Sequence, residues 1–174
     1  MKRKILLVDG YNMVAFWQET RSLFNKGELD AARTILLNKL SNYASFEQLE
    51  IICVFDAQYM PGARQTYDEF NVTVVFTEEE ETADDYIERL ATDLNNPRNQ
   101  VSVATSDLNE QWTVFAQGAL RVSARELEKR VAVTKSNLNQ MSQQLQMGKP
   151  PLRPMDNPTL RDLQKMMEKK KDDF

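Results

Sequence analysis

The chain has 174 residues, with 22 Lys and Arg against 26 Asp and Glu, one Cys and no His. The lack of imidazole excludes Ser-His-Asp triads, paired-His acid–base catalysis and His-ligated zinc sites, and the single Cys excludes a disulfide framework. An enzyme of this composition would work through carboxylates, hydroxyls, lysines or a hard cation bound by oxygen. No apolar run reaches the roughly 20 residues that span a bilayer. We therefore expect a cytoplasmic protein that has no membrane partner.

The net charge of -4 conceals two regions of opposite sign. Residues 1–122 carry a net charge of -8, and residues 123–174 carry +4. Four of the six prolines follow shortly after Gly148, where they predict an extended linker because proline lacks an amide donor and disfavours helix in the preceding residue. The sequence thus predicts one domain over residues 1–147, a linker over 148–158 and a short basic helix or tail over 159–174.

Apolar runs and helical periodicity alternate along the first region. Short apolar runs predict buried strands over residues 4–10, 51–56, 72–77 and 101–107. Apolar residues at steps of three and four predict helices over residues 29–43, 83–94 and 108–116. This alternation predicts an α/β fold, with a mostly parallel sheet flanked by helices.

A long C-terminal helix is predicted to begin at Ser123, which forms a capping-box pattern with Glu126. Its apolar positions run from Leu127 to Leu145 in alternating steps of four and three, a seam that can pack on the domain or on a partner helix. The oligomeric state does not follow from this pattern.

Aspartates lie at the ends of several predicted strands. Asp9, Asp56 and Asp107 each follow a strand, and Asp84 and Asp85 begin the helix after the strand at 72–77. The carboxyl ends of parallel strands meet at one edge of a sheet, where ligands bind. Any one of these residues could simply cap a helix. Their convergence from four elements favours a Mg²⁺ or Mn²⁺ site, which suits phosphodiester hydrolysis by a metal-activated water.

Five segments carry a resemblance to a known family: Leu7–Asn12, Val54–Ala57, Phe76–Asp85, Ala104–Asp107 and Phe115–Leu127. As an ordered set, these segments resemble the NYN domain of the YacP-like group, a branch of the PIN-like nucleases. The resemblance implies a PIN-like fold and a metal-dependent endoribonuclease that cleaves mRNA in association with the translating ribosome. It also implies products that carry a 5′-phosphate and a 3′-hydroxyl.

Carried over by motif, the resemblance makes Asp9, Asp84 and Asp107 the catalytic residues. Asp56 and Asp85 would be supporting ligands of Mg²⁺ or Mn²⁺.

Two polar residues complete the motifs. Asn12 would orient Asp9 or contact the scissile phosphate, although capping a helix is an equal alternative. Ser106 would form a hydrogen bond within the site.

The cations nearest these motifs are expected to bind substrate. Arg121, Arg125 and Lys129 recur at steps of four, which would place them on one helical face if the long helix extended back to Arg121. Arg64 lies in a loop after Asp56 and could border the substrate groove.

Two other functions fit the same sequence. A non-catalytic RNA-binding or ribosome-binding module could keep this fold without productive metal binding. A haloacid-dehalogenase-type phosphatase fits poorly, because Tyr11 stands where its second aspartate would be.

Overall fold

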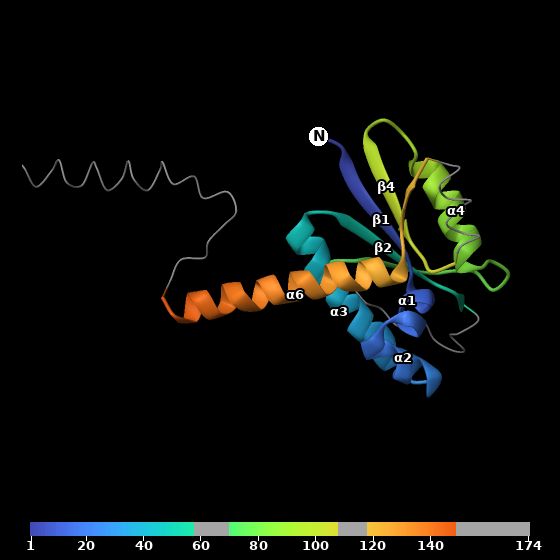
Figure 1. Ribbon diagram of the computed structural model, residues 1–174. Helices are drawn as coiled ribbons and strands as arrows, with labels where there is room; N and C mark the ends of the chain where they lie inside the picture. Colours follow the sequence, from blue (N-terminus) through green and yellow to red (C-terminus); the bar gives the residue numbers. More distant parts are fainter. Residues whose placement is uncertain (58–69, 108–117, 149–174) are drawn as a thin grey trace, which may run out of the picture. The chain divides into compact units, whose positions relative to one another are not determined.

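The computed structural model describes residues 1–57, 70–107 and 118–148 (Figure 1). The described strands are β1 (Arg3–Asp9), β2 (Glu50–Phe55), β3 (Thr73–Phe76), β4 (Asn99–Ala104) and β5 (Leu120–Val122). The described helices are α1 (Gly10–Phe16), α2 (Gln18–Asn25), α3 (Leu29–Glu47), α4 (Ala83–Leu94) and α6 (Ala124–Gln146). The chain divides into two compact units, Met1–Ser136 and Asn137–Phe174. The sheet lies entirely in the first unit.

The sheet is parallel throughout, with the strand order β3-β2-β1-β4-β5. β1 is central and pairs with β2 on one side and β4 on the other. Along the chain, β2 and β3 are added on one side of β1, and β4 and β5 are then added on its other side. In such sheets the crevice beyond the strand ends at this reversal is the usual ligand site. Here it lies between the ends of β1 and β4.

Alternation along the strands places apolar side chains on both faces of the sheet. In β1, Leu6 and Val8 join the cluster that includes residues of α1, α3 and α6. Ile5 and Leu7 join the second cluster, which includes Ile87 of α4. The first unit is thus a helix–sheet–helix sandwich, as Figure 1 shows, and the predicted α/β class is confirmed.

The four predicted strands are present, with boundaries shifted by up to three residues. Three elements were not predicted, namely β5 and the short helices α1 and α2. β5 has three residues, of which Leu120 and Arg121 are exposed, so it lacks the apolar pattern of a buried strand. The predicted helix at 108–116 and the linker and tail from residue 149 onward lie outside the described residues. Among the described helices, none is long and apolar enough to cross a membrane.

α6 begins where the capping box predicted, since the Glu126 N–H donates to Ser123 Oγ at 3.1 Å. The proposed extension of this helix back to Arg121 is wrong, because Arg121 belongs to β5. Arg121 therefore does not share a helical face with Arg125 and Lys129.

The first turns of α6 are fastened to the start of α2. Trp17 is 1% exposed and its indole N–H donates to the Ala124 carbonyl at 2.9 Å. The Gln18 N–H, at the N-terminus of α2, donates to Glu128 Oε2 at 2.8 Å. Glu128 supplies the capping acceptor that α2 lacks in its own sequence.

Candidate active site

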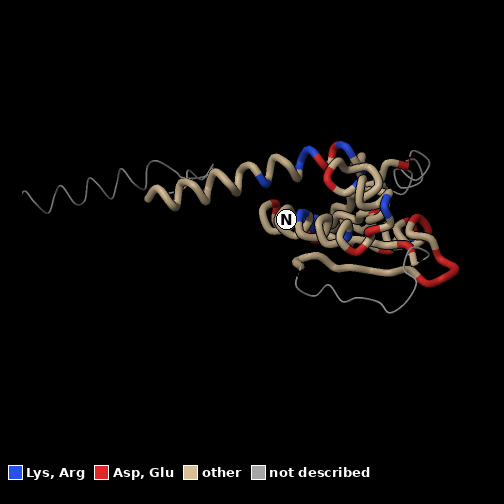
Figure 2. The backbone as a smooth tube through the Cα atoms, turned by 90° about the horizontal axis from the view of Figure 1, so that it is seen from below, with Lys and Arg blue, Asp and Glu red and all other residues tan. Residues whose placement is uncertain are grey.

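The ends of three neighbouring strands lie level with one another. Asp9, the last residue of β1, is paired in register with Val54 of β2, and Val8 is paired with Ala104 of β4. Asp56 therefore lies just beyond the end of β2, beside the end of β1. Figure 2, seen from the side where the strands end, shows Asp and Glu gathered around the loop before α4. We call Asp9, Asp56 and Asp84 the acidic rim.

Asp9 is the centre of the acidic rim. Its side chain is hydrogen-bonded to that of Asp84, and the residue is 8% exposed. Burial, the negative charge of Asp84 and a smaller effect of Asp56 raise the pKa of Asp9 to about 7. The Asp9 carboxyl therefore keeps its proton to a much higher pH than an exposed aspartate does.

The other two predicted ligands, Asp85 and Asp107, have exposed side chains. Asp85 follows Asp84 in the first turn of α4, and Asp107 follows the turn after β4. The Asp85 N–H donates to Thr82 Oγ1 at 3.2 Å, which makes Thr82 the N-cap of α4 as predicted. The Asp107 N–H donates to Thr105 Oγ1 at 3.1 Å. Within residues 1–57, 70–107 and 118–148, no three Asp, Glu or Cys side chains are grouped as a set of metal ligands. The structure thus brings Asp9 and Asp84 together. The catalytic and metal-binding roles of all five aspartates stay predictions.

Each residue of the Asp-Gly-Tyr-Asn motif, residues 9–12, has its own structural role. Asp9 is the N-cap of α1 and accepts from the Asn12 N–H at 3.4 Å. A Cβ on Gly10 would lie 2.3 Å from the Phe55 ring, so only glycine fits there. Tyr11 packs its ring 4.9 Å from the same Phe55 ring, centroid to centroid.

A buried arginine fixes the tyrosine of this motif. Arg33 is 5% exposed and donates to the Tyr11 hydroxyl at 2.8 Å and to Asp30 Oδ1 at 2.7 Å. The ion pair with Asp30 offsets the cost of burying the guanidinium charge. α3 therefore holds the turn that presents Asp9.

Asn12 connects α1 to the turn after β4. Its Oδ1 accepts from the Ser106 backbone N–H at 2.7 Å and from Ser106 Oγ at 2.5 Å. The alternative of Asn12 as a helix N-cap is wrong, because Asp9 caps α1. Asn12 thus holds the backbone that leads directly to Asp107.

Two threonines that were not among the predicted site residues also hold the backbone beside the aspartates. Thr77 is 1% exposed, donates its N–H to the Phe55 carbonyl at 3.1 Å and accepts from the Ala57 N–H at 3.1 Å through Oγ1. It therefore holds the backbone on both sides of Asp56. Thr105 is fully buried and accepts from Asp107. In the sequence, each threonine directly follows the last apolar residue of a predicted strand. Thr105 also lies two residues before Asp107.

The predicted cations lie beside this edge rather than within it. β5 runs parallel to β4, so its C-terminal end and the start of α6 lie at the same edge as Asp9. Arg121, Arg125 and Lys129 are all exposed there. Figure 2 shows Lys and Arg at the start of α6 and Asp and Glu in the loop before α4. Arg64 lies outside the described residues.

The donor set of the acidic rim fits a hard divalent cation. Mg²⁺ keeps several waters and is commonly bound by one or two carboxylates together with substrate phosphates. Asp9 and Asp84 supply two carboxyl groups within hydrogen-bonding distance of each other, and Asp56 adds negative charge. A cation bound to Asp9 and Asp84 would replace the proton that Asp9 otherwise keeps.

Comparison with known proteins identifies the family of the chain. Residues 6–168 match the YacP-like NYN domain family. The chain is 42% identical over 146 residues to the uncharacterized protein YacP of Bacillus subtilis, covering 84% of this chain and 85% of that protein.

Two crystal structures of Rae1 (YacP) from Bacillus subtilis are similar in fold. One superposes with a TM-score of 0.74 at 39% identity, covering 96% of this chain and 94% of the other. A mutant form gives a TM-score of 0.72 at 41% identity, covering 84% and 85%. The chain therefore belongs to the YacP-like NYN domain family, which has a PIN-like fold and implies a nuclease-type, RNA-related function.

Proposed function

We propose that the chain is a metal-dependent endoribonuclease that cleaves mRNA in the cytoplasm, in association with the translating ribosome. The observation that carries the proposal is the buried Asp9 carboxyl, hydrogen-bonded to Asp84 at the reversal of the strand order. Burying a carboxyl beside a second acidic residue is unfavourable unless a proton or a cation neutralises the charge, and carboxylate oxygens are the ligands that Mg²⁺ prefers.

Asp9 and Asp84 would hold Mg²⁺ or Mn²⁺, with Asp56, Asp85 and Asp107 as supporting acidic residues. Such a cation, when bound, lowers the pKa of a water and neutralises charge on the phosphate. The protein itself holds the acidic residues in place. Thr77 fixes the backbone around Asp56, and the Asn12–Ser106 hydrogen bonds fix the turn before Asp107.

Arg125 and Lys129, on the first turns of α6, would bind phosphates that flank the scissile one, and Arg121 of β5 lies beside them. Arg64 remains a candidate for the same role. The strongly negative net charge of residues 1–122 weakens the attraction of free RNA. Delivery of the substrate by the ribosome would compensate for that weakness.

The test is cleavage of a translated mRNA, followed by mapping of the new 5′ ends, in a translation system supplied with the purified protein. Wild type should produce new ends, and the variant Asp9→Asn/Asp84→Asn should not. A control, Glu28→Gln/Asp93→Asn, removes the same number of carboxylates from exposed positions and should cleave as wild type does. Undiminished cleavage by the first double variant would show that the site is elsewhere.

One observation favours a second candidate, the non-catalytic RNA-binding module. The described residues contain no ready-made group of three metal-ligating side chains. Calorimetric titration with Mn²⁺ separates the two functions. The enzyme should bind Mn²⁺ with a heat that is lost in Asp9→Asn, whereas the module should show no binding that depends on Asp9.

A further inference from the structure

Two hollows open near the edge of the sheet where the strands begin, one on each face of the sheet. One has a volume of about 490 Å³ and lies over the sheet between α3 and α6. The other has a volume of about 620 Å³ and lies between the end of α4 and the starts of β4 and β5. Both are lined by Gln100 and Leu120, near the starts of β4 and β5, which lie between the two hollows. We call the two together the basal groove.

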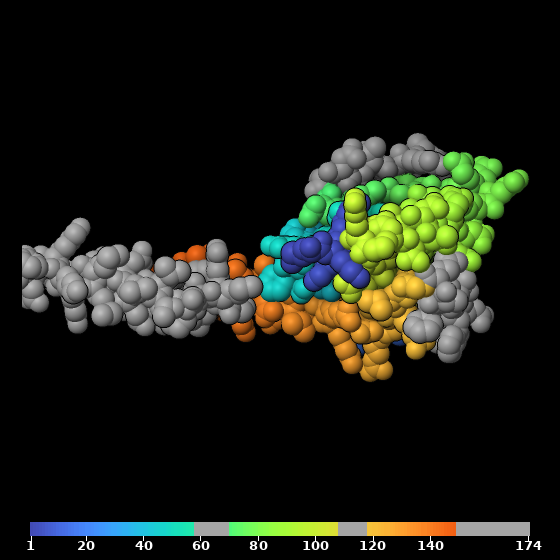
Figure 3. Space-filling model, turned by 90° about the horizontal axis from the view of Figure 1, so that it is seen from above, coloured from blue at the N-terminus to red at the C-terminus, as the bar shows by residue number. Residues whose placement is uncertain are grey.

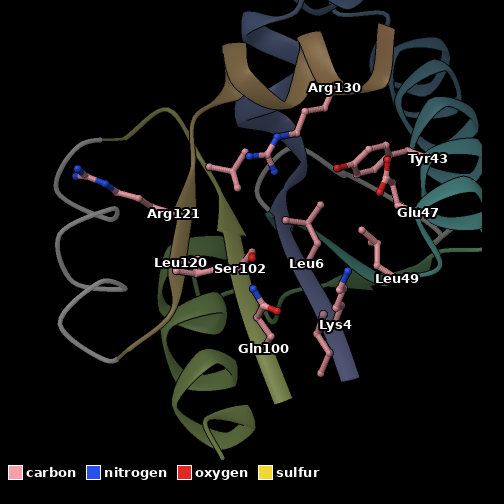
Figure 4. A pocket seen from close by; sticks show the side chains of 12 residues that line it. Lys4, Leu6, Tyr43, Glu47, Leu49, Gln100, Ser102, Leu120, Arg121 and Arg130 are labelled. Carbon is pink, nitrogen blue, oxygen red and sulfur yellow. The ribbon is translucent and has the colours of Figure 1, made fainter. Parts of the chain in front are cut away.

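The described lining of the basal groove is basic and rich in amides. Its charged residues are Lys2, Lys4, Arg130 and a single carboxylate, Glu47, and Arg121 borders it from β5. In Figure 4, Arg130 and Tyr43 point toward each other over the sheet, whereas Arg121 points away. The other hollow adds the side-chain amides of Asn95, Asn96 and Asn99. Asn99 already donates through Nδ2 to the Leu94 carbonyl at 3.0 Å, and Asn96 accepts from the Arg98 N–H at 2.9 Å. The groove therefore carries more positive than negative charge, and its charge comes mainly from the lysines.

Its lysines are available to a ligand. Lys2 and Lys4 are exposed, and neither forms an ion pair within the described part of the chain. Figure 3, which looks onto this edge, shows the start of the chain at the surface, between the segment that leads into β4 and the end of α3. Arg130 differs, because it is paired with Glu126 at 2.8 Å and hydrogen-bonded to Tyr43.

We propose that the basal groove binds the phosphate backbone of single-stranded RNA. This inference rests on the proposed function in taking RNA as the substrate, and it names a second place where the protein holds it. Lys, Arg, Asn and Gln are the side chains that commonly contact phosphate and sugar. The acidic rim repels phosphate unless a cation is bound, whereas the basal groove attracts it directly.

The two sites are separate along the strands. β1 runs for 7 residues from one edge to the other, about 20 Å at roughly 3.3 Å per residue. A contact in the basal groove would thus add affinity without touching the reacting phosphate. An acidic protein segment is the competing occupant, and the amides favour RNA because they can also bind the edges of unstacked bases.

The experiment measures binding of fluorescent polyuridine RNA by anisotropy, with the full chain in an Asp9→Asn background and with EDTA present, so that no cleavage occurs. The variant Lys2→Ala/Lys4→Ala should lose two phosphate contacts. At 0.1 M monovalent salt this should weaken binding by roughly 25-fold and reduce the log–log salt slope by about 1.4. Arg21→Ala/Lys26→Ala removes two exposed cations from α2 and its C-cap and should have little effect.

A second variant protects the test against misfolding. Gln100→Glu places a carboxylate on a residue that lines both hollows and should also weaken RNA binding. Unchanged affinity in both groove variants would overturn the proposal. Displacement of the RNA by polyglutamate as readily as by unlabelled polyuridine would overturn it in favour of an acidic protein partner.

The outcomes also distinguish this inference from the proposed nuclease function. If the groove variants bind RNA weakly but wild type with Mn²⁺ cleaves nothing, the groove stands and the nuclease proposal fails. If cleavage depends on Asp9 and Asp84 while the groove variants bind RNA like wild type, the nuclease proposal stands and the groove fails.

Discussion

Asp9→Asn should make the protein more stable at neutral and alkaline pH while removing a proposed metal ligand. Asparagine has nearly the same shape as aspartate and can still cap α1 by accepting from the Asn12 N–H. It cannot ionise, however. The variant therefore removes the cost of a buried carboxylate beside Asp84 without removing the helix cap.

The magnitude follows from the pKa of Asp9, which is raised from 3.8 to about 7 mainly by burial and next by the charge of Asp84. In that window the folded state binds the proton and the unfolded state does not, so the free energy of unfolding falls as pH rises from about 4 to about 7. At 1.36 kcal/mol for each pKa unit, the loss is at most about 4 kcal/mol. Below about pH 4 both states are protonated, and wild type and variant should be equally stable.

The assay is urea unfolding at several pH values from acid to alkaline, with EDTA present, followed by tryptophan fluorescence. The difference in unfolding free energy between Asp9→Asn and wild type should grow from near zero at about pH 4 to its full value near pH 8. Asp93→Asn, an exposed position on α4, should track wild type throughout. A constant difference across this range would show that Asp9 ionises freely in the folded protein and would refute the reasoning.

Three further changes test the packing around the site. Gly10→Ala should cost roughly 1–3 kcal/mol in urea unfolding, because the added Cβ would lie 2.3 Å from the buried Phe55 ring. Thr77→Val should cost about 1–3 kcal/mol, since it leaves the Ala57 N–H without its acceptor, and Thr77→Ser should restore most of that loss. Glu128→Ala should cost about 1 kcal/mol by uncapping α2, which chemical denaturation would detect as a lower midpoint. Equal stability of Thr77→Val and Thr77→Ser would contradict the role given to that hydroxyl.

The α/β class and the acidic edge could be predicted because their signals are local. Strands buried on both faces read as continuous apolar runs, and Thr82 and Ser123 cap their helices through residues three positions later in the chain. The position of Asp9 at a strand end followed from the same patterns.

The features that were missed depend on contacts between distant residues. β5 is a strand because β4 pairs with it, not because its own three residues alternate. α2 is capped by Glu128, 110 residues away from Gln18. The Asn12–Ser106 hydrogen bonds join residues 94 apart, so neither position alone indicated that Asn12 would hold the turn before Asp107.

The charge pattern predicted the two regions of opposite sign but not where single cations lie in the fold. The division into an acidic and a basic region is a property of the sequence. The placement of Arg121 on a strand, and of Lys2 and Lys4 beside hollows at the far edge of the sheet, depends on strand order.

The most direct test of the central claim is the rate at which the purified protein cleaves a translated mRNA with Mn²⁺ present, compared between two variants of α4. Asp84→Asn removes the partner of Asp9, and Asp93→Asn removes an exposed carboxylate from the same helix. Asp84→Asn should lower the rate by at least about 100-fold, beyond the loss typical of residues that only support a metal ligand. Asp93→Asn should cleave like wild type, and equal rates in the two variants would contradict the assignment of Asp9 and Asp84 as the catalytic centre.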